Sequence, residues 1–142
     1  MIYVIDASAM IAYLNGEKGA ELVERLLDDP SIHCHAHAVS FVEVYYRFRI
    51  DRGLTEVEAD KIVEDLMNAG ISRSENLDRS FCLKVGNFKS DYKYPQRDNR
   101  LPLGDCFVAA LAQHYKAKVV TCDHNDFDFL HQNKVLEVLF LN

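Results

Sequence analysis

IYVIDASAMIAYL, at residues 2–14, joins an expected strand directly to an expected helix. The β-branched run at residues 2–5 is typical of a buried strand, and the apolar spacing after Asp6 suits a helix that ends at Asn15-Gly16. Strand and helix patterns alternate in the same way through the rest of the chain. Strands separated by helices indicate a parallel sheet covered on both faces, so we predict an α/β fold.

The remaining elements follow from periodicity and from local start and stop signals. Further strands are expected near residues 32–38 and 71, and over residues 118–122 and 135–140. Helices are expected over residues 18–28, 40–52, 55–67, 78–89 and 104–117. Thr55 and Glu58 support one of these starts, because they match the capping-box pattern S/T-x-x-E. A chain of 142 residues fits one domain, which we expect to span residues 1–142.

Composition is that of a globular protein, since 49% of the residues are hydrophobic and can build a core. No apolar run approaches the roughly 20 residues that span a bilayer, and the N-terminus carries no basic leader. We therefore expect a cytoplasmic protein without a membrane partner. The cysteines lie far apart without a C-x-x-C spacing, which favours reduced, buried thiols over zinc ligands or disulfides. They are Cys34, Cys82, Cys106 and Cys122.

Four acidic residues lie at the boundaries of expected elements. Asp6 ends the first strand and Asp123 follows the strand KVVT, whereas Glu43 lies one turn into a helix and Asp105 at the start of another. Binding sites of parallel sheets lie at the carboxyl ends of the strands where the strand order reverses, so Asp6 and Asp123 should share one rim. Apolar neighbours of Glu43 and Asp105 indicate that these acids face a partly buried centre.

Each acid also has a purely structural alternative. Asp6 and Asp105 can be helix N-caps, Ser40 and Glu43 match the capping box, and Asp123 can be a turn residue. Carboxylates within ~6 Å of one another repel strongly, however, and a divalent cation would neutralise them. A ligand set of oxygens without His or Cys favours Mg²⁺ or Mn²⁺ over zinc. Such a centre is suited to phosphodiester hydrolysis.

Four segments resemble, in their usual order, the four acidic motifs of PIN-domain proteins. They are the strand-and-turn IYVIDASAMIAYL, the helix AVSFVEVYYRF, the segment LPLGDCFVAALA and the strand-and-turn VVTCDHNDFDFL. The resemblance covers essentially the whole chain and is closest to the toxin ribonucleases of VapBC-type toxin–antitoxin pairs. It implies a three-layer α/β/α sandwich with a central parallel sheet, and a Mg²⁺- or Mn²⁺-dependent endoribonuclease. It also implies a homodimer and a cognate antitoxin that blocks the site.

The resemblance also implies roles for individual residues. The acids that would bind the metal and act in catalysis are Asp6, Glu43, Asp105 and Asp123. Asp126, the acid before Phe127, would be a further metal ligand, either directly or through water. Ser8 and Thr121 would hydrogen-bond the carboxylates and orient them.

A basic segment precedes Asp105 in a protein whose formal net charge is -6. Its cations are interleaved with aromatic residues, so in a nuclease it becomes a candidate contact for the RNA backbone, with a solvated surface as the alternative. Tyr92 or Tyr94 would stack a base. The expected RNA-binding residues are Lys89, Lys93, Arg97 and Arg100.

Two groups of histidines raise other possibilities. His33, His35 and His37 alternate on an expected strand and would point to one side, which suggests a zinc site. No convincing fourth ligand exists, so a structural role is favoured. His124 follows Asp123 and is a candidate for substrate contact, with an ordinary surface role as the alternative.

The sequence also bears on functions other than a nuclease. A phosphatase with an aspartyl-phosphate intermediate usually shows D-x-D, whereas Asp6-Ala7-Ser8 lacks the second acid, and a receiver domain would need paired N-terminal acids. A free-standing RNA-processing nuclease and a non-enzymatic RNA-binding or assembly module stay open. The helix around Tyr45, Tyr46 and Phe48 is a candidate docking face for an antitoxin, with core packing as the alternative.

Overall fold

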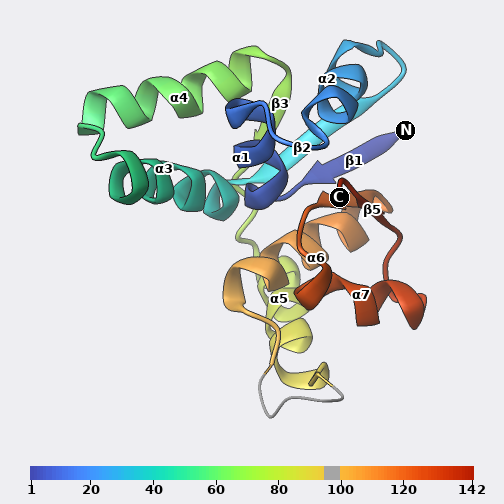
Figure 1. The fold of residues 1–142 in the computed structure, drawn as a ribbon. Helices are drawn as coiled ribbons and strands as arrows, with labels where there is room; N and C mark the ends of the chain where they lie inside the picture. The colour runs from blue at the N-terminus through green and yellow to red at the C-terminus, as the bar shows by residue number, and fades with distance from the viewer. Residues whose placement is uncertain (95–99) are drawn as a thin grey trace.

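A computed structural model describes residues 1–94 and 100–142 of the chain. Its centre is a five-stranded sheet in the order β3-β2-β1-β4-β5, in which each strand is parallel to its neighbours (Figure 1). The strands are β1 (Ile2–Ile5), β2 (His33–His37), β3 (Ile71–Ser74), β4 (Lys118–Thr121) and β5 (Val138–Phe140). The helices are α1 (Ala7–Asn15), α2 (Ala20–Asp28), α3 (Ala38–Arg52), α4 (Glu56–Asn68), α5 (Arg79–Asp91), α6 (Leu103–Tyr115) and α7 (His124–Gln132).

Helices cover both faces of the sheet, and successive strand residues point to opposite faces. Val4 and Val119 pack in the cluster with α5, α6 and α7, whereas Ile5 and Val120 pack in the cluster with α1 to α4. In Figure 1 the two sets of helices lie above and below the sheet. The structure therefore confirms the predicted three-layer α/β/α sandwich.

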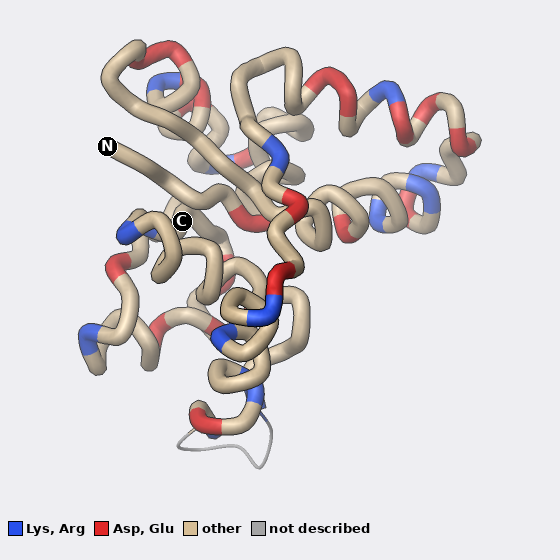
Figure 2. Tube along the Cα trace, turned by 180° about the vertical axis from the view of Figure 1, so that it is seen from behind, with Lys and Arg blue, Asp and Glu red and all other residues tan. Residues whose placement is uncertain are grey.

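Local signals in the sequence explain where several helices begin and end. Asp6 caps α1 by accepting a hydrogen bond from the Ala9 amide, and Gly16 ends the helix with a φ of 64°, which favours glycine. The capping box of Thr55 and Glu58 is formed at the start of α4 as predicted. Helices α3 and α4 form an antiparallel pair, and α4 carries mainly acidic residues, with Lys61 as its single cation (Figure 2).

The strand order places the candidate acids on one rim. The chain runs from β1 outward to β2 and β3, then crosses to β4 and β5 on the other side of β1. The order therefore reverses between β1 and β4, whose carboxyl ends carry Asp6 and Asp123. The Asp6 amide donates to the Val120 carbonyl at 3.1 Å, so the two strand ends lie against each other.

Three local predictions are wrong. The segment after β4 was expected to be a turn, but it forms α7, because the Asp123 side chain caps it by accepting from the Asp126 amide. The last strand is shorter than residues 135–140. The Ser40 and Glu43 capping box is not formed, because α3 begins earlier, with His37 as its N-cap.

The alternating histidines of β2 have separate surroundings. His37 is buried, and its Nδ1 accepts from the Val39 amide at 3.1 Å while its Nε2 lies 2.9 Å from the Asn76 carbonyl. The His35 ring packs against Tyr115 at 4.6 Å between centroids. His33 is exposed. These contacts support the structural interpretation over the zinc site.

The thiols are free, as expected, although not all of them are buried. Cys34 and Cys106 are buried and Cys122 is partly exposed, whereas Cys82 is exposed on α5, so the expectation of burial is wrong there. In the ranges that the structure describes, no helix is both long enough and apolar enough to cross a lipid bilayer.

Candidate metal centre

Asp6 is buried, with 3% of its surface exposed, and hydrogen bonds fix both of its carboxylate oxygens. Oδ1 accepts from the Ser8 hydroxyl at 2.7 Å and from the Ala9 amide at 2.9 Å. Oδ2 accepts from the Thr121 hydroxyl at 2.5 Å. The N-cap alternative for Asp6 is therefore correct, and the same carboxylate also stands on the rim between β1 and β4.

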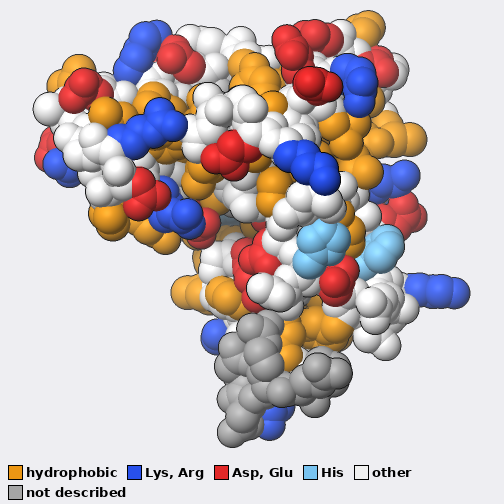
Figure 3. All heavy atoms as spheres, viewed as in Figure 1, with side chains coloured by type: hydrophobic (Ala, Val, Ile, Leu, Met, Phe, Trp, Pro, Cys, Tyr) orange, Lys and Arg blue, Asp and Glu red, His pale blue; other side chains and the backbone are white. Residues whose placement is uncertain are grey.

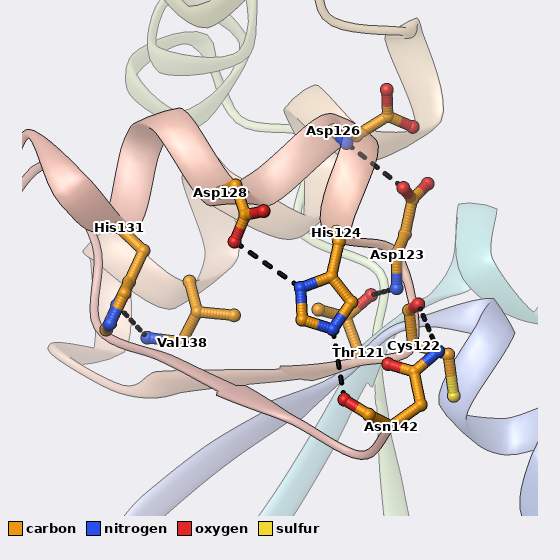
Figure 4. A network of polar contacts seen from close by, with 9 residues as sticks. All are labelled: Thr121, Cys122, Asp123, His124, Asp126, Asp128, His131, Val138 and Asn142. Carbon is orange, nitrogen blue, oxygen red and sulfur yellow. Dashed lines mark hydrogen bonds and ion pairs between the residues drawn. The ribbon is translucent and has the colours of Figure 1, made fainter.

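Two hydroxyl groups connect the turn after β1 with the turn after β4. The Ser8 hydroxyl accepts from the Cys122 amide at 3.0 Å. The Thr121 hydroxyl accepts from the Asp123 amide at 2.9 Å, as Figure 4 shows. The two oxygens lie 3.2 Å apart. These are the contacts that the predicted orienting role of Ser8 and Thr121 requires.

Asp105, Asp123 and Asp126 form the tightest group of carboxylates. One carboxylate oxygen from each lies within 4.8 Å of the others, and all three side chains are partly buried. Asp123 caps α7, and its Oδ1 accepts from the Asp126 amide at 3.0 Å, so the first turn of the helix brings both acids together (Figure 4). Asp105 lies in the first turn of α6 but does not cap it, since the N-cap is Pro102.

Asp6 and Glu43 lie outside this group of three but act on it electrostatically. The charge of Glu43 raises the pKa of Asp6, and the charge of Asp6 raises the pKa values of Asp105 and Asp123. Glu43 of α3 lies close to the start of α6. A Cβ atom built on Gly104 of α6 would be 3.5 Å from Glu43 Oε1. On the face shown in Figure 3, acidic side chains gather where the two sets of helices meet.

The pKa values of these acids are raised above the ordinary carboxylate range. Burial raises the pKa of Asp6 to about 6, against the opposing hydrogen bonds from Thr121, Ala9 and Ser8. Burial also raises the pKa values of Asp105 and Asp123, and the adjacent Asp126 raises both further. The group therefore retains protons near neutral pH unless a cation replaces them.

The donor set fits a hard divalent cation. It consists of carboxylate oxygens on partly buried acids, and within residues 1–94 and 100–142 no histidine or cysteine joins the group of three. Oxygen ligands of this kind suit Mg²⁺ or Mn²⁺ better than zinc. Three of the acids predicted from the sequence, Asp105, Asp123 and Asp126, thus lie together, and the charges of Asp6 and Glu43 act on the same group.

Part of the predicted RNA-binding segment has a structural role in the connection between α5 and α6. The Lys89 ammonium donates to the Leu101 carbonyl at 2.9 Å, and Arg100 Nη1 donates to the Ser90 carbonyl at 2.6 Å. Lys93 is exposed and forms an antiparallel backbone bridge with Arg100. Arg97, also predicted to bind RNA, lies outside the described residues.

Tyr94 does not have the position that the sequence predicted, whereas His124 takes the surface role that was its alternative. Tyr94 is 5% exposed and its hydroxyl donates to Asp126 Oδ1, so it is not available to stack a base. His124 is exposed at the start of α7, where its ring stacks on Phe140 at 4.2 Å and its Nε2 lies 3.1 Å from the Asn142 carbonyl (Figure 4). These contacts favour an ordinary surface role for His124.

The fold and the acid group define an α/β domain with an acidic centre at the switch point of a parallel sheet. The PIN domain family model matches residues 3–130, and the chain belongs to this family. PIN domains are generally nucleases, so the match leaves the phosphatase and receiver alternatives without support.

Solved structures give the same fold. The chain is similar to VapBC-1 from nontypeable Haemophilus influenzae, with 19% identity over 99% of this chain and 98% of that chain, at a TM-score of 0.72. It is similar to VapBC2 from Rickettsia felis bound to a DNA fragment from their promoter, with 13% identity over 100% of both chains, at a TM-score of 0.72. VapBC-5 from Mycobacterium tuberculosis has 19% identity over 98% of both chains and a TM-score of 0.62. No curated protein matches the chain.

Proposed function

We propose that this protein is a Mg²⁺- or Mn²⁺-dependent endoribonuclease and the toxin of a toxin–antitoxin pair. The observation that carries the proposal is the convergence of Asp105, Asp123 and Asp126, with Asp6 and Glu43 beside them, at the switch point of the sheet. Membership of the PIN domain family supports a nuclease. The similar VapBC structures support a toxin with a cognate antitoxin.

The residues that would hold the metal are the five acids of the centre, Asp6, Glu43, Asp105, Asp123 and Asp126. When bound, a divalent cation supplies an activated water and neutralises charge on the phosphodiester oxygens. Ser8 and Thr121 hold the Asp6 carboxylate in one orientation. This fixed orientation reduces the reorganisation needed when substrate binds.

The chain's own acids also manage protons at the centre. Without a cation, the raised pKa of Asp105 keeps a proton on its carboxyl, which hydrogen-bonds Asp126. The Asp126 amide holds Asp123 in place at the same time. Binding of a divalent cation would release the proton, so the affinity for Mn²⁺ should rise with pH.

Cleavage of RNA by the purified protein tests the proposal. Product should form only when Mg²⁺ or Mn²⁺ is present, and Asp105→Asn should reduce the rate by about 100-fold or more, because it removes a ligand from the centre. Asp128→Asn is the matched control, since Asp128 lies on α7 and pairs with His124 instead of the acids. Metal-independent cleavage, or full activity of Asp105→Asn, would show that the acid group is not the nuclease centre.

The antitoxin would dock on an apolar stripe of α3. Of the three residues predicted for docking, Phe48 is buried in the core and Tyr45 is partly buried against it, whereas Tyr46 is 44% exposed. Val42 and Ile50 lie four residues to either side of Tyr46 and are also exposed, so the three share one helical face. Solved toxin–antitoxin complexes with this fold support a protein partner for such a face. The RNA substrate, the homodimer and the cytoplasmic location remain predictions.

A further inference from the structure

Tyr94 reaches the acid group from the connection between α5 and α6. Its hydroxyl donates to Asp126 Oδ1, and its ring meets the Phe129 ring edge-on at 5.3 Å between centroids. Asp126 and Phe129 lie three residues apart on α7, so they share one side of the helix. One side chain of the connection therefore contacts the first and second turns of α7 together.

The backbone around Tyr94 is anchored independently of the acids. Lys93 pairs with Arg100 as an antiparallel bridge, and Arg100 donates to the Ser90 carbonyl at the end of α5. The neighbouring Tyr92 ring stacks on Phe88 at 5.3 Å. These contacts fix where the Tyr94 hydroxyl lies, because the phenol is rigid beyond its two side-chain torsions.

Asp126 interacts with three other acids of the centre. One of its carboxylate oxygens lies within 4.8 Å of one from Asp105 and one from Asp123, and its charge adds to burial in raising the pKa of Glu43. A hydrogen bond to Oδ1 determines the direction in which the carboxylate faces these three neighbours. Partners of this kind fix the rotamer of a metal ligand, and their loss typically weakens metal affinity by about 10- to 100-fold.

We propose that Tyr94 is a positioning residue for the metal centre, acting by holding the Asp126 carboxylate toward Asp105 and Asp123. The inference rests on the proposed function in one respect, since it takes the acid group to bind a divalent cation. Through Tyr94, the α5–α6 connection would support the metal centre itself, in addition to any contact with substrate.

The test is the affinity of the purified, metal-free protein for Mn²⁺, measured by calorimetric titration. Tyr94→Phe removes the hydroxyl and leaves the ring against Phe129, so the variant should fold with an unchanged circular dichroism spectrum and bind Mn²⁺ about 10- to 100-fold more weakly. Tyr92→Phe is the matched control, because it removes the same group from a ring that packs on Phe88. Its affinity should equal that of the natural chain.

A double-mutant cycle shows whether the effect passes through Asp126. In the Asp126→Asn background, adding Tyr94→Phe should cause little further loss of affinity. An equal further loss there, or an affinity of Tyr94→Phe equal to that of Tyr92→Phe, would overturn the positioning role while leaving the metal centre intact. If the natural chain binds no Mn²⁺, the proposed metal-dependent function fails, and this inference fails with it.

Discussion

Replacing Asp105 by asparagine should stabilise the metal-free protein, although it should abolish cleavage. The side chain is partly buried beside Asp123 and Asp126, so its ionised form is disfavoured and its pKa is raised. Because the pKa of Asp105 is raised in the folded state, the free energy of unfolding is greatest below the pKa that Asp105 has in the unfolded chain. That stability is lost as the pH rises through the folded pKa. Asparagine keeps the volume of the side chain and never ionises, so its advantage should appear at pH 8 and vanish near pH 4.

The magnitude follows from the shifts at this centre. Burial and the adjacent Asp126 raise the pKa of Asp105 from 3.8 to about 9, and each unit of difference corresponds to about 1.4 kcal/mol of stability. Asp105 is partly exposed and shares its proton with Asp126, so only part of this shift acts on stability, and we expect a gain on the order of 1–3 kcal/mol at pH 8. For a chain of 142 residues this corresponds to a rise in Tm of roughly 3–9 °C.

Thermal unfolding followed by circular dichroism measures this gain. The natural chain, Asp105→Asn and the control Asp128→Asn are compared in chelator at pH 8 and at pH 4, and again with Mn²⁺ at pH 8. Mn²⁺ should raise the Tm of the natural chain and of the control but not that of Asp105→Asn. A lower Tm for metal-free Asp105→Asn at pH 8 would refute the reasoning. It would mean that burial and the neighbouring acids do not disfavour the ionised form of Asp105.

Three other predictions concern the surroundings of the centre. Thr121→Val should lower the free energy of unfolding by about 1–3 kcal/mol in urea titrations, since it leaves Asp6 Oδ2 and the Asp123 amide without their partner, and Thr121→Ser should restore it. Ile50→Asp should change stability by less than about 0.5 kcal/mol, because the side chain is 74% exposed, yet it should reduce co-purification with the antitoxin. Unchanged co-purification would remove the α3 stripe as the docking face. Lys93→Glu should weaken RNA binding in filter assays without altering Mn²⁺ affinity, and equal RNA binding would contradict the assigned contact.

The sequence was sufficient to predict the layers and the shared rim of Asp6 and Asp123. Both predictions depend on short-range patterns: β-branched runs followed by helical spacing, and an acid directly after a strand. Combined with the rule for parallel sheets, these patterns place two residues that are far apart in the chain next to each other. The hydroxyl partners Ser8 and Thr121, which the resemblance implies, lie in the same two turns and donate to Asp6.

What the sequence did not predict depends on tertiary structure or on a weak local signal. The residues of α7, HNDFDFLHQ, have few strong helix formers, so the local signal at Asp123 fits a turn as well as an N-cap. Without α7, only the resemblance to PIN-domain proteins places Asp126 near Asp123. The contact between Tyr94 and Asp126 joins residues that are 32 positions apart in the sequence. Tyr94 lies in a connection between two helices, where no hydrophobic periodicity predicts the position of a side chain.

The hydroxyl bridge between the turns after β1 and β4 joins residues 8 and 121 of the chain, and the acid group is completed only by Asp126. During translation, Asp6 leaves the ribosome early, while Asp123 and Asp126 are still to be synthesised. A nascent or prematurely terminated polypeptide that stops before this point has no assembled centre. If the protein is the ribonuclease proposed above, synthesis therefore delays its activity until residue 126 has been made.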